Sequence, residues 1–121
     1  MRKKILVVDD ELLLARSLKR VLEKRGFEVY MVTSVAEAMA ILTVEEIDLC
    51  ITDLAMPAES GIDLLKKIRT NDRLKDLPVI VQSGFSRQAQ KEVLALNPVR
   101  IFSKPVPLDE LIRTIQEQLG A

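Results

Sequence analysis

Five short apolar runs alternate with amphipathic stretches along the whole chain, and this alternation restricts the possible folds more than any other feature. The runs cover residues 5–8, 27–32, 47–52, 78–82 and 99–102. A strand that is apolar on both faces is typical of a parallel sheet with helices on both sides. We therefore predict an α/β fold in which a strand–helix unit occurs five times and forms a five-stranded, doubly wound parallel sheet.

Helices are predicted between the runs, because apolar residues recur there at helical spacing. The first helix covers residues 12–25 and ends at Gly26, a left-handed cap. Its apolar face is formed by Leu14, Leu18, Val21 and Leu22. Ser34 and Glu37 predict a capping box at the start of the second helix. The apolar stripe behind this box is Val35, Ala38, Met39 and Leu42.

Three further helices complete the predicted pattern. Residues 61–69 form a helix with Leu65 and Ile68 facing inward. Residues 86–96 are mostly polar, so that helix has a thin apolar face, formed by Ala89, Val93 and either Leu94 or Leu96. The last helix begins with Pro107 in its first turn. Its apolar stripe is Leu108, Leu111, Ile112, Ile115 and Leu119.

The composition narrows the classes of protein that the chain can belong to. Its 121 residues suit a single domain, residues 1–121. Lys plus Arg and Asp plus Glu are 18 each, so no basic excess favours direct binding of nucleic acid. No histidine is present, which excludes histidine triads and histidine metal sites. The single cysteine, Cys50, has apolar neighbours and indicates a buried thiol in a reducing compartment. With no membrane span or signal peptide in the sequence, we expect a cytoplasmic location.

Polar residues follow four of the five predicted strands. Asp9 and Asp10 follow the first, Asp53 the third, Ser83 the fourth and Lys104 the fifth. Parallel strands bring their carboxyl ends to one edge of the sheet, where ligands bind in doubly wound folds. If the strand order is 2-1-3-4-5, the strands that carry these residues are neighbours. We therefore expect the five side chains to converge.

Three carboxylates at close range repel one another unless a cation lies between them. Oxygen ligands suit Mg²⁺, with Mn²⁺ as the alternative. A carboxylate nucleophile, a divalent ion, a lysine and a hydroxyl are together the groups needed to hold a phosphoryl group on an aspartate. Each residue alone has a simpler explanation: an aspartate pair often caps a helix, Asp53 can be a loop residue, Ser83 can lie in a turn, and Lys104 can be a solvated surface residue. Their joint placement at strand ends argues against coincidence.

The chain resembles the receiver domain of two-component response regulators over essentially its whole length. The motifs that carry the resemblance are Ile5-Leu6-Val7-Val8-Asp9-Asp10-Glu11, Asp53-Leu54-Ala55-Met56-Pro57, Gly61, Ser83 and Lys104-Pro105. The resemblance implies a flavodoxin-like fold with strand order 2-1-3-4-5. It also implies a cis peptide bond between Lys104 and Pro105.

The same resemblance implies roles for the residues at the strand ends. Asp53 would accept a phosphoryl group from a phosphohistidine. Asp10, Asp53 and the backbone carbonyl of Ala55 would ligate Mg²⁺, and Asp9 would contact the ion mainly through water. Lys104 would pair with Asp53 before phosphorylation and with a phosphoryl oxygen afterwards. Ser83 would hydrogen-bond another phosphoryl oxygen.

The partners implied are a sensor histidine kinase or a phosphotransfer protein, then an output domain or partner protein, and a homodimer is possible. Neither nucleic acid nor a membrane would bind this domain directly. It would not be an enzyme beyond catalysing its own phosphotransfer and a slow hydrolysis of the acyl phosphate. Slow hydrolysis is expected because Ala55 and Phe85 occupy positions that tune phosphoryl lifetime, and neither side chain can act as a base.

Two departures from the family pattern concern the conformational switch. Ile101 stands where the family usually has a Tyr or Phe that swings inward, and the nearby aromatic residue, Phe102, would face the other side of the strand. Asn97-Pro98 replaces the usual Gly-Ala before this strand, which makes the loop stiffer.

Three other functions compete with a phosphorylation switch. A receiver-like module that docks partners without phosphorylation is favoured by Ile101 and opposed by the complete set of acidic residues, serine and lysine. An aspartate-nucleophile phosphatase needs a second carboxylate two residues after the nucleophile, where this chain has Ala55. A flavin-binding protein needs a phosphate loop rich in Gly, Ser or Thr after the first strand, which is absent from the sequence.

Overall fold

Five parallel strands form one sheet in the order β2-β1-β3-β4-β5, as predicted. The structure is a computed structural model that describes residues 2–56, 59–82 and 87–120. The strands are β1 (Lys4–Val8), β2 (Glu28–Val32), β3 (Leu49–Asp53), β4 (Val79–Gln82) and β5 (Arg100–Phe102). Each agrees with a predicted apolar run to within two residues at either end.

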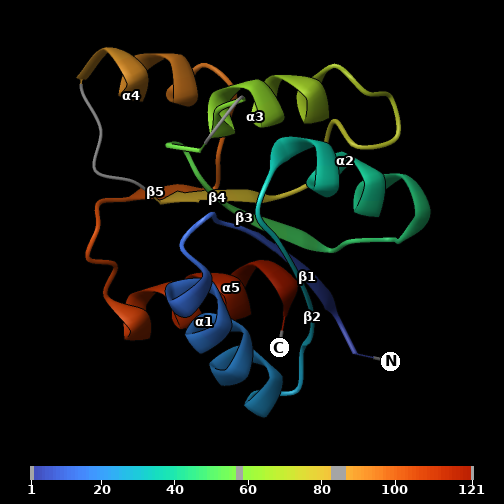
Figure 1. The fold of residues 1–121 in the computed structure, drawn as a ribbon, viewed down its shortest axis with the longest axis vertical. Helices are drawn as coiled ribbons and strands as arrows, with labels where there is room; N and C mark the ends of the chain where they lie inside the picture. The colour runs from blue at the N-terminus through green and yellow to red at the C-terminus, as the bar shows by residue number, and fades with distance from the viewer. Residues whose placement is uncertain (1, 57–58, 83–86, 121) are drawn as a thin grey trace.

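Helices cover both faces of the sheet, which makes it doubly wound (Figure 1). One face carries α2 (Val35–Val44), α3 (Gly61–Arg69) and α4 (Arg87–Leu94). The other face carries α1 (Leu12–Lys24) and α5 (Leu108–Leu119). The reversal of winding that this requires lies between β1 and β3, at the carboxyl ends of the two strands.

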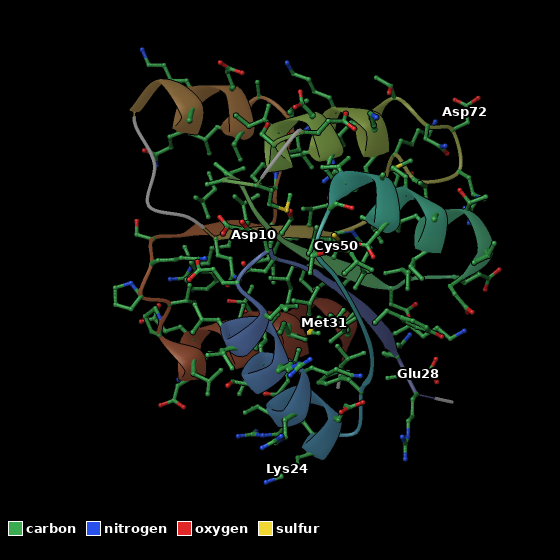
Figure 2. The ribbon with its side chains drawn as sticks, in the orientation of Figure 1. Asp10, Lys24, Glu28, Met31, Cys50 and Asp72 are labelled. Atoms are coloured by element: carbon green, nitrogen blue, oxygen red, sulfur yellow. The ribbon has the colours of Figure 1, made fainter. Side chains whose placement is uncertain are left out.

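Successive strand residues face opposite layers, so the sheet divides the core in two. In β1, Leu6 and Val8 pack toward α2 and α3, whereas Ile5 and Val7 pack toward α1 and α5. Cys50 lies in the first of these layers and is fully buried (Figure 2). The predicted burial of this cysteine is therefore confirmed, and burial raises the pKa of its thiol to about 12.

Three details of the predicted helices are wrong. In α1 the buried residues are Ala15, Leu18 and Leu22, while Leu14 is 53% exposed because it lies at the edge of the contact with the sheet. In α5, Leu108 is 43% exposed in the first turn. Pro107 is the N-cap of that helix, one position before its first turn.

The capping box predicted for α2 is only half formed. Ser34 Oγ accepts a hydrogen bond from the Glu37 N–H, but the Glu37 carboxylate accepts one from the Thr33 N–H rather than from that of Ser34. A reciprocal box forms at α3 instead, where Ser60 and Asp63 each accept a hydrogen bond from the backbone N–H of the other. Residues outside the helix decide which N–H the carboxylate reaches, and the sequence spacing does not contain that information.

The α4 helix is held mainly at its C-terminal end. Val93 is buried and Leu96 is partly buried, whereas Leu94 is 56% exposed, so Leu96 rather than Leu94 provides the second anchor. The Arg69 guanidinium donates to the carbonyl oxygens of Leu96 at 2.7 Å and Asn97 at 3.0 Å. The same guanidinium also donates to carbonyls of the loop before β4. These bonds tie the loop after α4 to α3.

Gly61 lets α3 begin directly against the end of β3. Its N–H donates to the Leu54 carbonyl at 3.0 Å. A Cβ atom at this position would lie 2.2 Å from the carbonyl oxygen of Asp53, which is far inside van der Waals contact. The backbone that carries Asp53 is therefore fixed partly by the absence of a side chain at residue 61.

We expect Gly61→Ala to lower the free energy of unfolding by at least about 2 kcal/mol, because the new methyl group forces the backbone beside Asp53 to move. Urea denaturation measures the loss. Gly120→Ala is the matched control: nothing lies within 4 Å of that position, and only its left-handed φ of +68° is strained, at about 1 kcal/mol. Equal losses in the two variants would contradict the proposed close approach at Gly61.

Candidate functional site

Three aspartates meet at the carboxyl edge of the sheet. Asp9 directly follows β1 and is 1% exposed, and Asp53 ends β3 and is 3% exposed. Asp10, in the turn that leads from β1 into α1, is exposed (Figure 2). One carboxylate oxygen from each of the three lies within 4.8 Å of the others. The predicted convergence of the acidic residues is therefore confirmed.

Lys104, which follows β5, extends its side chain into this cluster. Its Nζ lies 2.8 Å from Asp53 Oδ2 and 3.5 Å from Asp9 Oδ2. The same Nζ lies 2.7 Å from Glu11 Oε1. The Lys104 side chain is 23% exposed, so its ammonium group is screened from solvent only in part. The Lys104–Pro105 peptide bond is cis, as expected.

Each buried carboxylate has further hydrogen bonds that fix its orientation. Asp53 Oδ1 accepts a hydrogen bond from the Ala55 N–H at 3.2 Å. Asp9 Oδ1 accepts one from the Glu11 N–H at 2.9 Å, and Asp9 Oδ2 lies 3.4 Å from the Gln82 amide nitrogen. The two oxygens of each carboxylate therefore face different donors.

The site has more negative than positive groups, with Lys104 in contact with the carboxylates of Asp9, Asp53 and Glu11. Burial raises the pKa of Asp9, and the Glu11 N–H and the Lys104 charge oppose that shift only in part. Burial also opposes the charge on Lys104, but its hydrogen bonds to Asp53 and Glu11 hold the pKa of Lys104 above its ordinary value. Lys104 is thus charged at neutral pH and offsets part of the repulsion among the carboxylates.

The donor set fits a hard divalent cation. Asp10 and Asp53 offer carboxylate oxygens, and the exposed residue Ala55 follows Asp53 closely enough for its N–H to bond the Asp53 side chain. Oxygen donors of this kind, with room for water on the exposed side, are typical of Mg²⁺ sites. The cluster is therefore compatible with a divalent metal.

A cavity of about 570 Å³ opens beside the cluster, between α1 and α5. Asp9, Glu11 and Lys104 line its polar end, together with Gln82. Its other walls are mostly apolar. The cavity and the carboxylate cluster thus share one mouth.

Of the sequence-predicted residues, the structure brings together Asp9, Asp10, Asp53 and Lys104, with Ala55 alongside. Ser83 and Phe85 lie outside the described residues. Sequence reasoning assigned no role to two residues that touch the cluster, Glu11 and Gln82. Glu11 extends the acidic run Asp9-Asp10, and Gln82 is a polar residue at the end of an apolar strand. These two sequence features do not by themselves predict a role in the site, because a Glu after an acidic pair or a Gln at a strand end can equally face solvent.

The profile of the response regulator receiver domain matches residues 5–116 of this chain. The chain is a response regulator receiver domain. Its relatives include "Sporulation initiation phosphotransferase F" of Bacillus subtilis, 30% identical over 98% of this chain and 95% of that protein. Another is "Transcriptional regulatory protein CrdR" of Helicobacter pylori, 36% identical over 92% of this chain, which spans about half (52%) of that protein's length. A response regulator receiver protein from Pseudomonas putida has a crystal structure that matches with a TM-score of 0.93 and 33% identity, over 97% of this chain and 98% of that one.

Strand β5 directs its two apolar residues to opposite faces of the sheet. Ile101 is partly buried against the layer that contains α3 and α4, and it pairs with Val81 of β4. Phe102 is 4% exposed and packs in the opposite layer, toward α5. The prediction that the aromatic ring faces away from the usual switch position is confirmed.

No helix within residues 2–56, 59–82 and 87–120 of the receiver is long and apolar enough to cross a lipid bilayer.

We expect Mg²⁺ to stabilise the receiver, because a cation relieves the repulsion among the three aspartates. The gain is about 1.4 kcal/mol in free energy of unfolding when Mg²⁺ is at ten times its Kd. Thermal unfolding at constant ionic strength measures it. Asp10→Asn should abolish the gain, whereas Asp72→Asn, at an exposed residue far from the cluster (Figure 2), should retain it. Equal stabilisation of both variants would show that Mg²⁺ binds elsewhere.

Proposed function

We propose that this receiver accepts a phosphoryl group on Asp53 from the phosphohistidine of a sensor histidine kinase or phosphotransfer protein. The phosphorylated form then controls an output domain or a partner protein, and residues 1–121 act as one domain. The observation that carries this proposal is the setting of Asp53. Its carboxylate ends a central strand, with one oxygen on Lys104 and the other on the Ala55 N–H, beside two more aspartates.

The chemistry required of the chain is nucleophilic attack by a carboxylate. An oxygen of Asp53 forms the new P–O bond while the P–N bond to the donor histidine breaks, and the electron pair of that bond stays with the histidine nitrogen. Lys104 starts 2.8 Å from Asp53 and so lies within reach of the phosphoryl oxygens. Ser83, beyond the described end of β4, is proposed as a second donor to them.

A divalent ion is proposed to complete the site. Asp10, Asp53 and the backbone carbonyl of Ala55 would hold Mg²⁺, or Mn²⁺ in its place, and Asp9 would contact it through water. Bound there, the ion would neutralise charge on the phosphoryl oxygens. The receiver would act only on its own phosphoryl group. Slow hydrolysis stays a prediction, supported by the methyl side chain of Ala55, which cannot activate a water molecule.

The phosphodonor must cover the site, and two exposed leucines lie beside it. We call them the leucine rim: Leu14 and Leu108, which are 53% and 43% exposed. Both line the same cavity as Lys104, whose ammonium contacts Asp53. Exposed apolar side chains beside the site suit the apolar face of a helix that carries the phosphohistidine.

With Mg²⁺ and acetyl phosphate, we expect the wild-type protein to gain the mass of one phosphoryl group, because Asp53 needs only an activated donor and not a specific protein. Intact-mass spectrometry measures this gain. Asp53→Asn should not be modified, and chelation of Mg²⁺ should stop the reaction in the wild type. The Asp72→Asn variant serves as the control for an unrelated change of charge.

If neither acetyl phosphate nor a histidine kinase modifies Asp53, the proposal is wrong and the phosphorylation-independent docking module becomes the better explanation. Beryllofluoride, followed by NMR, then tests the switch separately. Changes that depend on Asp53 and reach α4 would support a working switch. Changes confined to the strand ends would indicate that Ile101 has altered it.

For the leucine rim, we expect Leu14→Asp to slow phosphotransfer from a phosphohistidine protein by about ten-fold, because a charge replaces an apolar contact in the docked complex. Phosphorylation by acetyl phosphate should be unchanged, since that donor needs no docking surface. Val44→Asp is the matched control, because Val44 is 75% exposed at the end of α2. A loss of both reactions in Leu14→Asp would point to damage at the site and not to docking.

A further inference from the structure

Glu11 is the outermost of the carboxylates that contact Lys104. Its side chain is 54% exposed, against 2% for that of Asp9 and 4% for that of Asp53. Even so, its contact with the Lys104 ammonium, at 2.7 Å, is as short as that of Asp53, at 2.8 Å. The lysine is therefore shared between a buried carboxylate at the reacting position and a solvent-facing carboxylate at the mouth of the site.

Helix capping does not explain this side chain. Glu11 is the N-cap residue of α1, but its carboxylate makes no capping hydrogen bond. Ser, Thr, Asp and Asn are the residues that stabilise this position. The backbone N–H of Glu11 donates to Asp9, and its carboxylate is directed at Lys104. Both groups of the residue thus act on the cluster and not on the helix.

We propose that Glu11 is a positioning residue that competes with the phosphoryl group for Lys104 and so weakens the hold of the site on an anion at Asp53. This inference rests on the proposed function. A phosphoryl group brings a charge near −2 to Asp53, and a lysine has a single positive charge to share. The contact with Glu11, at 2.7 Å, draws Lys104 toward the mouth of the site and therefore competes with the pull of the phosphoryl oxygens on the same ammonium.

The charge of Glu11 acts in the same direction as this competition. A carboxylate at the mouth repels an incoming anion and attracts a cation. Neutralising Glu11 should therefore strengthen the binding of a phosphoryl-like anion and weaken the binding of Mg²⁺. Opposite effects on the two ligands distinguish this role from general damage to the site, which would weaken both.

The test compares wild type, Glu11→Gln and Glu11→Asp. Calorimetric titration with Mg²⁺ alone gives the first affinity, and titration with beryllofluoride at saturating Mg²⁺ gives the second. We expect Glu11→Gln to bind beryllofluoride about two- to five-fold more tightly, the range for a partly exposed ion pair, and to bind Mg²⁺ more weakly. Glu117→Gln, an exposed residue at the far end of α5, is the control and should match wild type.

Glu11→Asp separates competition from charge, because its shorter side chain keeps the charge but withdraws it from Lys104. Competition predicts tighter beryllofluoride binding in this variant too, together with a shift of the Lys104 ammonium NMR signal in the free protein. Wild-type affinity in Glu11→Asp would overturn the competition. Unchanged or weaker beryllofluoride binding in Glu11→Gln would overturn the proposal as a whole. Beryllofluoride binding by wild type confirms separately that the Asp53 site accepts such an anion, and its failure there would remove the proposed function and this inference together.

Discussion

The ion pairs between the Lys104 ammonium and the carboxylates that end β1 and β3 are the interaction on which this sheet edge depends. Asp9 and Asp53 are almost fully buried, and two such charges without a counterion would destabilise the fold. The strand order places β4 between β3 and β5, so a long side chain has to cross the end of β4. The lysine side chain is long enough to do so. Its charge lies on one small ammonium group, which contacts three carboxylates at once.

A site arranged in this way can exchange ions. A divalent cation can approach the fixed carboxylates, and the lysine can turn toward an anion, because Lys104 contacts several carboxylates and depends on no single one. Backbone N–H groups from Glu11 and Ala55 hold the two buried carboxylates in place while this happens. The absence of a side chain at Gly61 lets α3 pack directly against the backbone at the end of β3. Carboxylates held by backbone N–H groups, beside a lysine shared among several of them, suit a group that arrives and leaves.

The two apolar residues of β5 lie in opposite layers of the core. Ile101 packs in the layer that contains α4, and Phe102 is buried in the opposite layer, which contains α5. The end of α4 is held by Val93 and Leu96 and by the hydrogen bonds that Arg69 donates to the loop after the helix. An aliphatic side chain on β5 can fill space under α4 without the polar tip of a tyrosine. The proposed switch would therefore have to act through an aliphatic side chain at residue 101.

The sequence by itself determined the five strand–helix units, because apolar runs and helical spacing are local properties of the chain. It also determined which acidic residues and which lysine follow the strands, and the strand order then made their convergence predictable. Only the tertiary structure decided which side of a helix touches the sheet, as the exposed Leu14 shows. The same holds for Glu11 and Gln82, whose roles depend on side chains that lie far away along the chain. Spacing along the sequence fixes the position of a residue in its own element, whereas contacts between elements depend on how those elements pack.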